Sequence, residues 1–479
     1  MLSSRIKISL SIVLFAFLIL SCQDSNEEKV DHSNYKVFKG AKLYIGNGEI
    51  IENAVIVVNG DRIESVGSDG SGIPDGAEIH DVTGKYITPG MVDSHIHFFQ
   101  TAFFDSRPDA MDLRDSLPYE EVYDYQKNNP QRYYEAYLRS GVTAVYDVGD
   151  FMWTLEFESD TTHALKPHIV SAGPLLTPVP KEYLSTFNLE TDSVIKPVES
   201  KKMALDHVKN VSEAGGKGIK IWTLNTQDSV FMGIVREIAK TAEQFDNHII
   251  AHATNLDEAK AVLELGAHLL VHSVEDTIVD QEFLDLAKRG PTYYNPTLVV
   301  SRGYYNTYKA VLGEEFEITD PNNVVDDKTK TLLRTASNYD NFIRDRKRLE
   351  ERLARTEINL SRTDSIMAIN LKKVYDAGIP IVVGTDAGNP GTIHGISIFD
   401  EMEAMQQAGL PPKDIITMAT KNGAEAMVRE NEIGTIEIEK IADFIILNED
   451  PGEDISNMRS LTHVIRGGKM IDVTKKFED

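Results

Sequence analysis

Residues 89–97 read Pro-Gly-Met-Val-Asp-Ser-His-Ile-His, an apolar run that carries polar side chains at alternate positions. Successive side chains of a β-strand point to opposite faces, so Asp93, His95 and His97 share one face of the predicted strand. Two imidazoles on one face can bind a single metal ion. A His-x-His pair also occurs in strands that bind no metal, so its meaning depends on the rest of the chain.

Alternating strand and helix patterns continue outward from this stretch over residues 89–430. Apolar β-prone runs are separated by amphipathic helical patterns such as 203–213 and 230–245. The predicted strands are 91–97, 143–148, 168–172, 218–222, 248–252, 268–272, 292–295 and 380–384. Repeated units of this number predict an α/β fold, a (β/α)8 TIM barrel.

The widest gap between predicted strands separates the seventh from the eighth and gives an insertion at residues 303–370. A long charged helix is predicted over 342–376, after an acidic, Asn-rich loop. Such an insertion is typical of a lid or of a contact in a homo-oligomer, and the sequence leaves both interpretations open.

Short β-prone pieces separated by Gly, Asn and Asp occupy both ends of the chain, in residues 35–88 and 431–479. Neither end holds enough strands to close a sheet by itself. We therefore expect the two ends to pair into one small β-sandwich beside the barrel.

The first 34 residues predict a membrane anchor. Two basic residues precede an apolar run over residues 8–20, and Ser21-Cys22 follows. This run is short for a bilayer span and has the length of a signal-peptide core. The pattern resembles a bacterial lipoprotein signal, in which residues 1–21 are removed, Cys22 is lipidated and residues 22–34 form a tether. A plain secretion signal is the alternative. The lipoprotein interpretation places the chain in the bacterial cell envelope, lipid-anchored and facing the periplasm or the exterior.

Composition excludes several classes of function. Hydrophobic residues make up 41% and charged residues 26%, as in ordinary soluble globular proteins. The 49 Lys and Arg residues against 75 Asp and Glu give a net charge of −26, which repels a phosphate backbone and excludes a nucleic-acid partner. Cys22 is the only cysteine in the chain, so an internal disulfide framework and a Cys-rich zinc site are excluded.

Side chains that can bind a metal recur at the ends of the predicted strands. The fourth strand contains Lys220 between two isoleucines, the fifth ends at His252, the sixth ends at His272, and the eighth leads into Asp386. Active sites of TIM barrels lie at the rim where the C-terminal ends of the strands meet. A lysine in such a strand is costly to bury as an ammonium and is better tolerated as a neutral amine or with its charge inverted.

This ordered set, with residues 89–97 and 384–386, resembles the amidohydrolase superfamily, nearest its imidazolonepropionase-like and prolidase-like (metal-dependent dipeptidase) branch. The resemblance covers nearly the whole chain after the signal segment. It implies two divalent ions with these ligands: His95, His97 and Asp386 for the first ion, His252 and His272 for the second, and a CO2-derived carbamate on Lys220 as the bridge between them. Zinc suits imidazole and oxygen ligands best, and iron, manganese and cobalt stay open.

The chemistry implied by this resemblance is hydrolysis by metal-activated hydroxide. Two cations lower the pKa of a shared water toward neutrality. Asp386 is expected to take a proton from the hydroxide and to pass it to the leaving amine, as general base and then general acid. No Ser or Cys nucleophile is required.

Four residues near the predicted rim are candidates for substrate contact. Trp222 follows Lys220 where relatives have small residues, and Tyr146 stands on the second strand where relatives have Arg. For Tyr293, on the seventh strand, the alternative to a substrate contact is a position in the core or wall of the barrel. For His394, in the loop after Asp386, the alternative to a substrate contact is a solvent-exposed position in that loop. We expect core or surface roles for the remaining histidines that we considered: His163, His168, His207 and His268.

The leading hypothesis is a metal-dependent hydrolase of carbon–nitrogen bonds that acts on dipeptides, as a dipeptidase or prolidase does. Hydrolysis of a cyclic amide, such as an imidazolone or a lactam, is the alternative. A hypothesis of another class is a non-catalytic, metal-containing binding protein of the envelope. The expected partner is a small amide or dipeptide in the first two cases.

Overall fold

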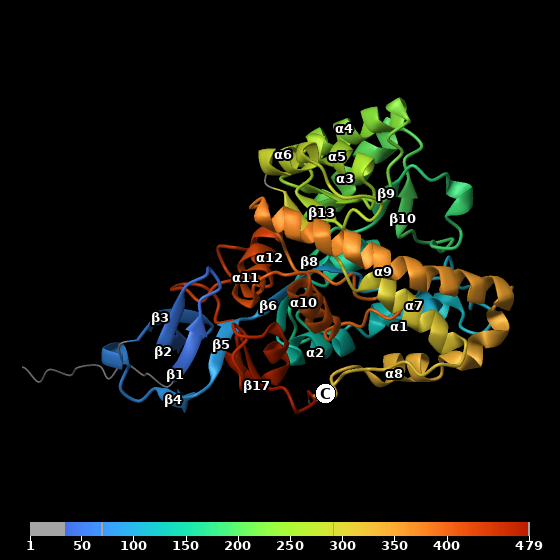
Figure 1. Cartoon of the computed structure of the whole chain (residues 1–479). Coiled ribbons are helices and arrows are strands. Elements are labelled where there is room, and N and C mark those ends of the chain that lie inside the picture. The colour runs from blue at the N-terminus through green and yellow to red at the C-terminus, as the bar shows by residue number, and fades with distance from the viewer. Residues whose placement is uncertain (1–33, 69, 291, 478–479) are drawn as a thin grey trace, which may run out of the picture.

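The structure, a computed structural model, describes residues 34–68, 70–290 and 292–477. The barrel forms the centre of the molecule, and a β-sheet lies to one side of it (Figure 1). Cys22 and the signal segment lie outside the described residues. Within the described part of the chain, no helix combines the length and the apolar character needed to cross a membrane.

Parallel strands in the predicted order line the barrel. Seven are assigned as strands: β6 (Met91–Ile96), β7 (Val142–Asp147), β8 (His168–Ser171), β11 (Gly218–Ile221), β12 (His248–His252), β13 (Leu269–Val271) and β14 (Tyr293–Asn295). Each begins and ends within two residues of its predicted bounds. The neighbouring pairs β6–β7, β7–β8, β11–β12, β12–β13 and β13–β14 are all parallel.

The barrel closes through an eighth extended segment at residues 380–384. The Tyr294 amide donates to the Pro380 carbonyl at 2.8 Å, and the Ser94 amide donates to the Val383 carbonyl at 2.9 Å. These bonds join the segment to β14 on one side and to β6 on the other. Its ladder is reduced to an isolated bridge between Tyr294 and Ile381, so it is not a regular strand. The predicted (β/α)8 fold is nonetheless confirmed, because every position around the barrel is filled.

Amphipathic helices cover the outside of the barrel, as Figure 1 shows for α3 to α6. They are α2 (Gln131–Arg139), α3 (Lys201–Glu213), α4 (Ser229–Gln244), α5 (Leu256–Glu264), α6 (Gln281–Arg289), α10 (Ser397–Gln407), α11 (Pro412–Met418) and α12 (Lys421–Ala426). Side-chain caps begin several of them, because Ser200, Asp228, Asn255 and Asp280 accept hydrogen bonds from backbone amides of the first turn.

The predicted insertion is helical and packs on the barrel. It contains α7 (Val300–Val311), α8 (Asp327–Arg334) and α9 (Arg346–Asp376), and α9 crosses the molecule as one long helix (Figure 1). Its apolar side chains form a second buried cluster with Phe103 and Phe104 from the loop after β6. That loop continues to α1 (Tyr119–Asn128). The insertion therefore fixes the loop that follows the His-x-His strand.

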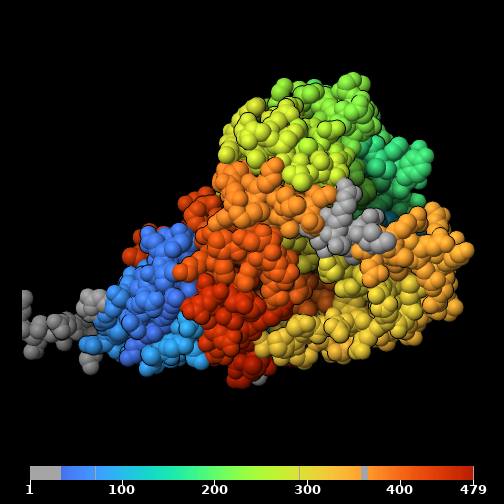
Figure 2. Space-filling model, in the orientation of Figure 1, coloured from blue at the N-terminus to red at the C-terminus, as the bar shows by residue number. Residues whose placement is uncertain are grey.

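Strands from the two chain ends combine, as predicted, but in one mixed sheet rather than in the two sheets of a sandwich. Figure 2 shows the N-terminal part (blue) packed against the C-terminal part (red). The strand order is β17-β16-β15-β5-β1-β2-β3, with β4 also paired to β1. The strands are β1 (Tyr35–Tyr44), β2 (Ile50–Asn59), β3 (Arg62–Gly67), β4 (Glu78–Asp81), β5 (Tyr86–Pro89), β15 (Phe444–Leu447), β16 (Leu461–Arg466) and β17 (Lys469–Asp472). The length of β1 explains the single sheet, since β2, β4 and β5 can all pair with it.

Candidate metal centre

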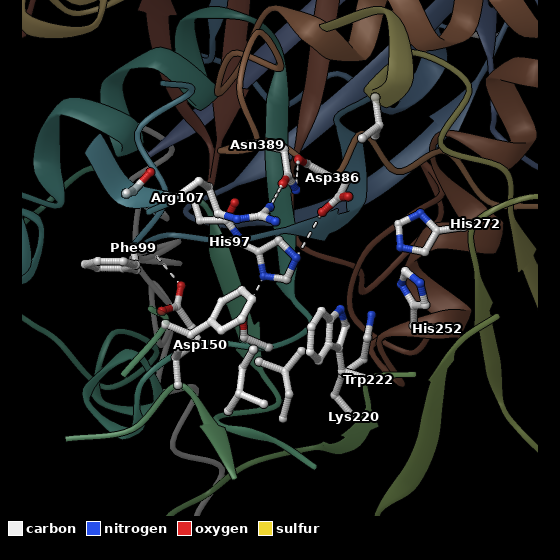
Figure 3. Close-up of a pocket in the computed structure, with 18 of the residues that line it drawn as sticks. His97, Phe99, Arg107, Asp150, Lys220, Trp222, His252, His272, Asp386 and Asn389 are labelled. Carbon is white, nitrogen blue, oxygen red and sulfur yellow. Dashed lines mark hydrogen bonds and ion pairs between the residues drawn. The ribbon is translucent and has the colours of Figure 1, made fainter. Parts of the chain in front are cut away.

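Six side chains of the predicted ligand set converge at the C-terminal rim of the barrel. They come from five positions around the barrel: His95 from β6 with His97 directly after it, Lys220 from β11, His252 from β12, His272 directly after β13, and Asp386 two residues after the eighth segment. All except His95 line one cavity of about 300 Å³ (Figure 3). His95 lies behind this wall with no exposed surface.

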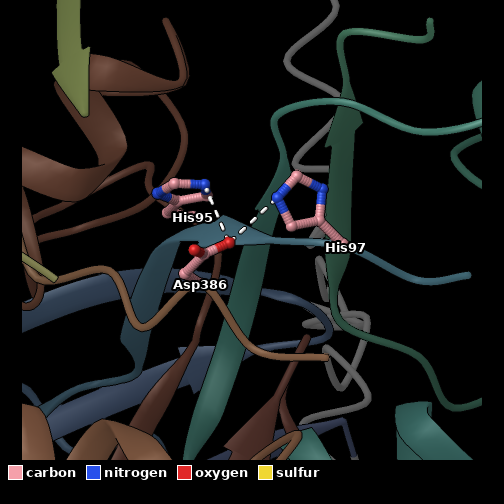
Figure 4. Close-up of side chains that lie close together, drawn as sticks. All are labelled: His95, His97 and Asp386. Carbon is pink, nitrogen blue, oxygen red and sulfur yellow. Dashed lines mark ion pairs between the residues drawn. The ribbon is translucent and has the colours of Figure 1, made fainter. Parts of the chain in front are cut away.

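The closest cluster within this set consists of His95, His97 and Asp386. Oδ1 of Asp386 lies 3.2 Å from Nε2 of His95 and 2.9 Å from Nε2 of His97 (Figure 4). One ligand atom from each residue lies within 4.8 Å of the other two. The three are buried, with exposed fractions of 0%, 6% and 4%.

Hydrogen bonds around this cluster show which atoms are free to bind a cation. Nδ1 of His97 lies 2.6 Å from the Gly149 carbonyl oxygen, which can only accept, so this nitrogen carries the proton. Nε2 of a neutral His97 is then a lone pair that faces a carboxylate oxygen. Nε2 of His95 and Oδ1 of Asp386 are both buried without a hydrogen-bond partner among the described residues. A cation between these atoms would satisfy all three, so the residues fit a metal ion.

His252, His272 and Lys220 lie next to this cluster. The His272 ring is 5.1 Å from the His95 ring and 4.4 Å from the His252 ring, measured between centroids. Nδ1 of His272 lies 2.8 Å from the hydroxyl of Thr297, which fixes the orientation of that ring. Lys220 is 1% exposed and faces the same cavity.

The protonation states of the clustered side chains suit cation binding. Burial lowers the pKa of His272 to about 4 and lowers the pKa of His95 well below its usual value, so both rings are neutral at pH 7. Burial would raise the pKa of Asp386, but His95 and His97 hold it well below its ordinary range. Burial lowers the pKa of Lys220 to about 7, although Asp386 and Asp147 favour its charged form. The neutral rings of His95 and His272 thus lie near an ionised Asp386 carboxylate.

The backbone at the strand ends is held in an uncommon conformation. His272 and Asp386 have φ angles of 75° and 59°, in the left-handed region that side chains other than glycine seldom adopt. Asp93 supports the second of these turns, because its carboxylate accepts hydrogen bonds from the amide and the hydroxyl of Thr385 at 3.0 and 2.7 Å. Asp93 therefore positions the segment that carries Asp386.

The structure corrects three of the four predicted substrate contacts. Tyr146 is 1% exposed and packs in the apolar interior of the barrel, below the rim. Tyr293 begins β14, so it lies at the opposite end of that strand, where its hydroxyl donates to Glu425. His394 is buried, with Nδ1 bonded to the Tyr137 hydroxyl and Nε2 to the Gln100 carbonyl, because its loop folds back under the loop after β6. Trp222 does line the cavity.

The four histidines expected in core or surface positions lie outside the cavity. His168 pairs with Asp443 at 2.7 Å, and His207 donates from Nε2 to the Pro174 carbonyl at 2.9 Å. Nε2 of His268 lies 3.1 Å from the Ala426 carbonyl, and His163 pairs with Asp160. None of the four lines the cavity within the described part of the chain.

Arg107 and Asn389 line the cavity and were not singled out from the sequence. Arg107 lies on the loop after β6, ten residues beyond His97, and Asn389 follows Asp386 by three residues. One guanidinium nitrogen of Arg107 donates to Oδ1 of Asn389, and the Tyr304 hydroxyl donates to the same atom at 2.7 Å. The only sequence signal for these residues was their place in loops of the catalytic rim.

Comparison with known proteins agrees with this architecture. The profile of the amidohydrolase family matches residues 86–471. The chain belongs to the amidohydrolase family.

The imidazolonepropionase of Geobacillus kaustophilus is 32% identical to this amidohydrolase over 108 residues, which are 22% of this chain and 25% of that protein. The chain thus spans about a quarter of the length of this curated relative. The imidazolonepropionase of Fusobacterium nucleatum is 24% identical over 426 residues, 84% of this chain and 87% of that protein. The structure of a Xaa-Pro dipeptidase with bound methionine in its active site superimposes with a TM-score of 0.69 at 21% identity and covers 91% of this chain and all of that one. That likeness establishes the fold.

Proposed function

We propose that this amidohydrolase is a metal-dependent enzyme that cleaves the amide bond of dipeptides, as a dipeptidase or prolidase does. The observation that carries the proposal is the buried cluster of His95, His97 and Asp386, whose ligand atoms face one another at the rim of the barrel. Two lone pairs and a carboxylate oxygen at such distances repel one another unless a cation lies between them.

The donor set suggests which residues hold the metal. His95, His97 and Asp386 would bind one divalent ion, with zinc as the expected metal, and His252 and His272 would bind a second. Lys220 would bridge the two ions as a carbamate, because this modification removes the cost of burying an ammonium that is 1% exposed. Such ions supply a nucleophilic hydroxide at neutral pH and polarise the scissile carbonyl.

Asp386 is the residue of this chain that would move the proton. Its carboxylate is buried and lines the cavity, so it could accept a proton from the attacking water. The same carboxyl group can then donate that proton to the leaving amine. His97, held through the Gly149 carbonyl, and Asn389, which donates to the Asp386 carbonyl at 3.3 Å, keep the carboxylate in place.

Arg107 supports a substrate that carries a free carboxylate. Its guanidinium forms two bonds with Asp109, of 2.8 and 2.7 Å, and one with Asn389. Two of the five N–H groups of an arginine therefore have no partner among the described residues. Asp109 does not line the cavity, whereas Arg107 does, so the guanidinium faces the site with its counter-ion behind it. A carboxylate of the substrate can pair with these free N–H groups.

A panel of dipeptides and cyclic amides, assayed with metal-loaded and metal-stripped protein, tests the proposal. We expect metal-dependent release of free amino acids from dipeptides. Cleavage of imidazolones or lactams alone would favour the second candidate, which the alignment over 426 residues with an imidazolonepropionase supports. Metal binding without turnover of any substrate would favour a binding protein.

We further propose that the chain is a lipoprotein of the bacterial cell envelope, anchored through Cys22. The apolar run over residues 8–20 and the position of the only cysteine support this proposal.

A further inference from the structure

Residues 173–199 form an excursion between β8 and α3 that is additional to the barrel. It contains the short strands β9 (Leu175–Thr177) and β10 (Ile195–Pro197), which lie beside the barrel in Figure 1. β10 pairs with β9, and β9 pairs with β11. The Trp222 amide donates to the Leu176 carbonyl at 2.8 Å, so the excursion is joined to the strand that carries Lys220.

Polar contacts fix this excursion in place. The side chain of Asn188 accepts from the amide of Ile195 at 3.1 Å and donates to its carbonyl at 2.7 Å. The hydroxyl of Tyr119 donates to the Phe187 carbonyl at 2.8 Å, and His207 donates to the Pro174 carbonyl at 2.9 Å. Residues of the barrel, of α1 and of α3 therefore hold the excursion in place.

The face that this excursion turns toward the metal centre is apolar. Its described residues that line the cavity are Leu175, Phe187, Val194 and Ile195, and none is polar or charged. Trp222 completes the surface, with its ring 5.4 Å from that of Phe187. Phe187, Val194 and Trp222 are only partly buried, so they leave apolar surface for a ligand to cover.

Two polar side chains of the cavity, Arg107 and Asn389, lie away from Trp222. Figure 3 shows Arg107 and Asn389 on one side of His97 and Trp222 on the other. A dipeptide whose carboxylate pairs with Arg107 places its scissile bond at the metal centre. The residue on the far side of that bond, which supplies the carbonyl, then meets the apolar wall.

We infer that the wall formed by Leu175, Phe187, Val194, Ile195 and Trp222 binds a large apolar or aromatic side chain on the acyl side of the scissile bond. This inference rests on the proposed dipeptidase function and names its substrate class. A substrate whose large apolar side chain is covered by this wall should have a kcat/KM about 10- to 100-fold higher than a substrate with a small side chain.

The substrate test uses matched dipeptides that differ only in the first residue: Phe, Leu, Ala, Asp or Lys, each followed by Ala. We expect kcat/KM to be about 10- to 100-fold higher for Phe and Leu than for Ala, and lowest for Asp and Lys. Phe187→Ala should reduce the ratio of kcat/KM between the Phe and Ala substrates by about tenfold. Leu184→Ala is the matched control, because Leu184 belongs to the same apolar cluster but does not line the cavity. It should leave the ratio unchanged.

A binding measurement separates this inference from the proposed function. Trp222 lines the cavity, whereas Trp153, the other of the two tryptophans, is buried elsewhere. The variant Trp222→Phe therefore shows which part of the tryptophan fluorescence comes from the wall. We expect L-phenylalanine to change the fluorescence of the metal-loaded parent at concentrations at which L-alanine does not, and we expect Trp222→Phe to lose the change.

Four outcomes decide the matter. A preference for Phe and Leu that Phe187→Ala weakens supports the inference, and so does the fluorescence change in a protein that cleaves no dipeptide, although that protein would refute the proposed function. Equal kcat/KM for all five dipeptides overturns the inference while the function stands. A loss in Phe187→Ala that is equal for Phe and Ala substrates also overturns it, because the role is then structural.

Discussion

Replacing Arg107 by Met removes a guanidinium from the cavity while keeping a side chain of similar length. In the parent, the guanidinium is held by Asp109 and Asn389 and lies 5.5 Å from the centre of the Tyr304 ring. Its side chain is 20% exposed, so it is largely but not fully withdrawn from water. The substitution leaves Asp109 without its partner, but that side chain is 22% exposed and can be solvated.

The expected loss follows from this partial burial. Removing one member of a fully desolvated charge pair costs about 2–5 kcal/mol. Because Arg107 keeps some contact with water and Asp109 already neutralises part of its charge, the lower half of that range applies, about 2–3 kcal/mol. At about 1.36 kcal/mol for each factor of ten, kcat/KM for a dipeptide with a free carboxylate should fall about 30- to 150-fold.

The assay compares each dipeptide with its C-terminal carboxamide, which has no charge to pair with Arg107. We expect the parent to prefer the acid, and Arg107→Met to remove this preference with little change for the carboxamide. Arg114→Met is the matched control, because Arg114 forms the same two-bond pair with Asp112 on the same loop but does not line the cavity. Equal losses for acid and carboxamide in Arg107→Met, or a similar loss of preference in Arg114→Met, would refute the assignment.

Four further changes test other parts of the molecule. Asp386→Asn should keep the fold, seen by circular dichroism, and lower kcat about 10²- to 10⁴-fold, and an unchanged kcat would remove Asp386 from proton transfer. Lys220→Ala should lose one metal equivalent by elemental analysis, restored in part by short carboxylic acids, whereas two retained equivalents would exclude the bridge. Burial lowers the pKa of His207 to about 4, so the unfolded chain binds more protons between pH 6.5 and 4, and folding stability should fall as the pH drops through this window, by about 3 kcal/mol in full. His207→Gln keeps an N–H donor and should lose less stability between pH 7 and 4.5 than the parent or His163→Gln; equal losses in all three would contradict this. Cys22→Ser should abolish metabolic labelling by fatty acid and release the protein from membranes, and continued labelling would place the lipid elsewhere.

The candidate metal ligands that lie in or directly after strands could be predicted from the sequence, because strand geometry is local. His95, His97, Lys220, His252 and His272 stand in or directly after apolar runs whose ends were predicted within two residues. Parallel strands of a barrel present their C-terminal ends at one rim, so the order of these residues along the chain already implied that they meet.

The residues proposed to contact a substrate could not be predicted in this way. Tyr146 and Tyr293 were assigned to the rim from their strands, yet their contacts depend on the position along the strand and on the layers of the barrel interior. His394 was placed at the rim with its loop, but the loop folds back so that Tyr137 and Gln100 enclose the ring. Arg107 belongs to no motif, and the loop that carries it packs against the insertion.

The sequence by itself determined the barrel, its order of strands and the set of side chains able to hold metal ions. These depend on periodicity and on chain order, which are properties of neighbouring residues. The tertiary structure alone decided the single mixed sheet of the chain ends and the places of the guanidinium and of the apolar wall in the cavity. These depend on how segments far apart in the chain pack together, and no local pattern records such contacts.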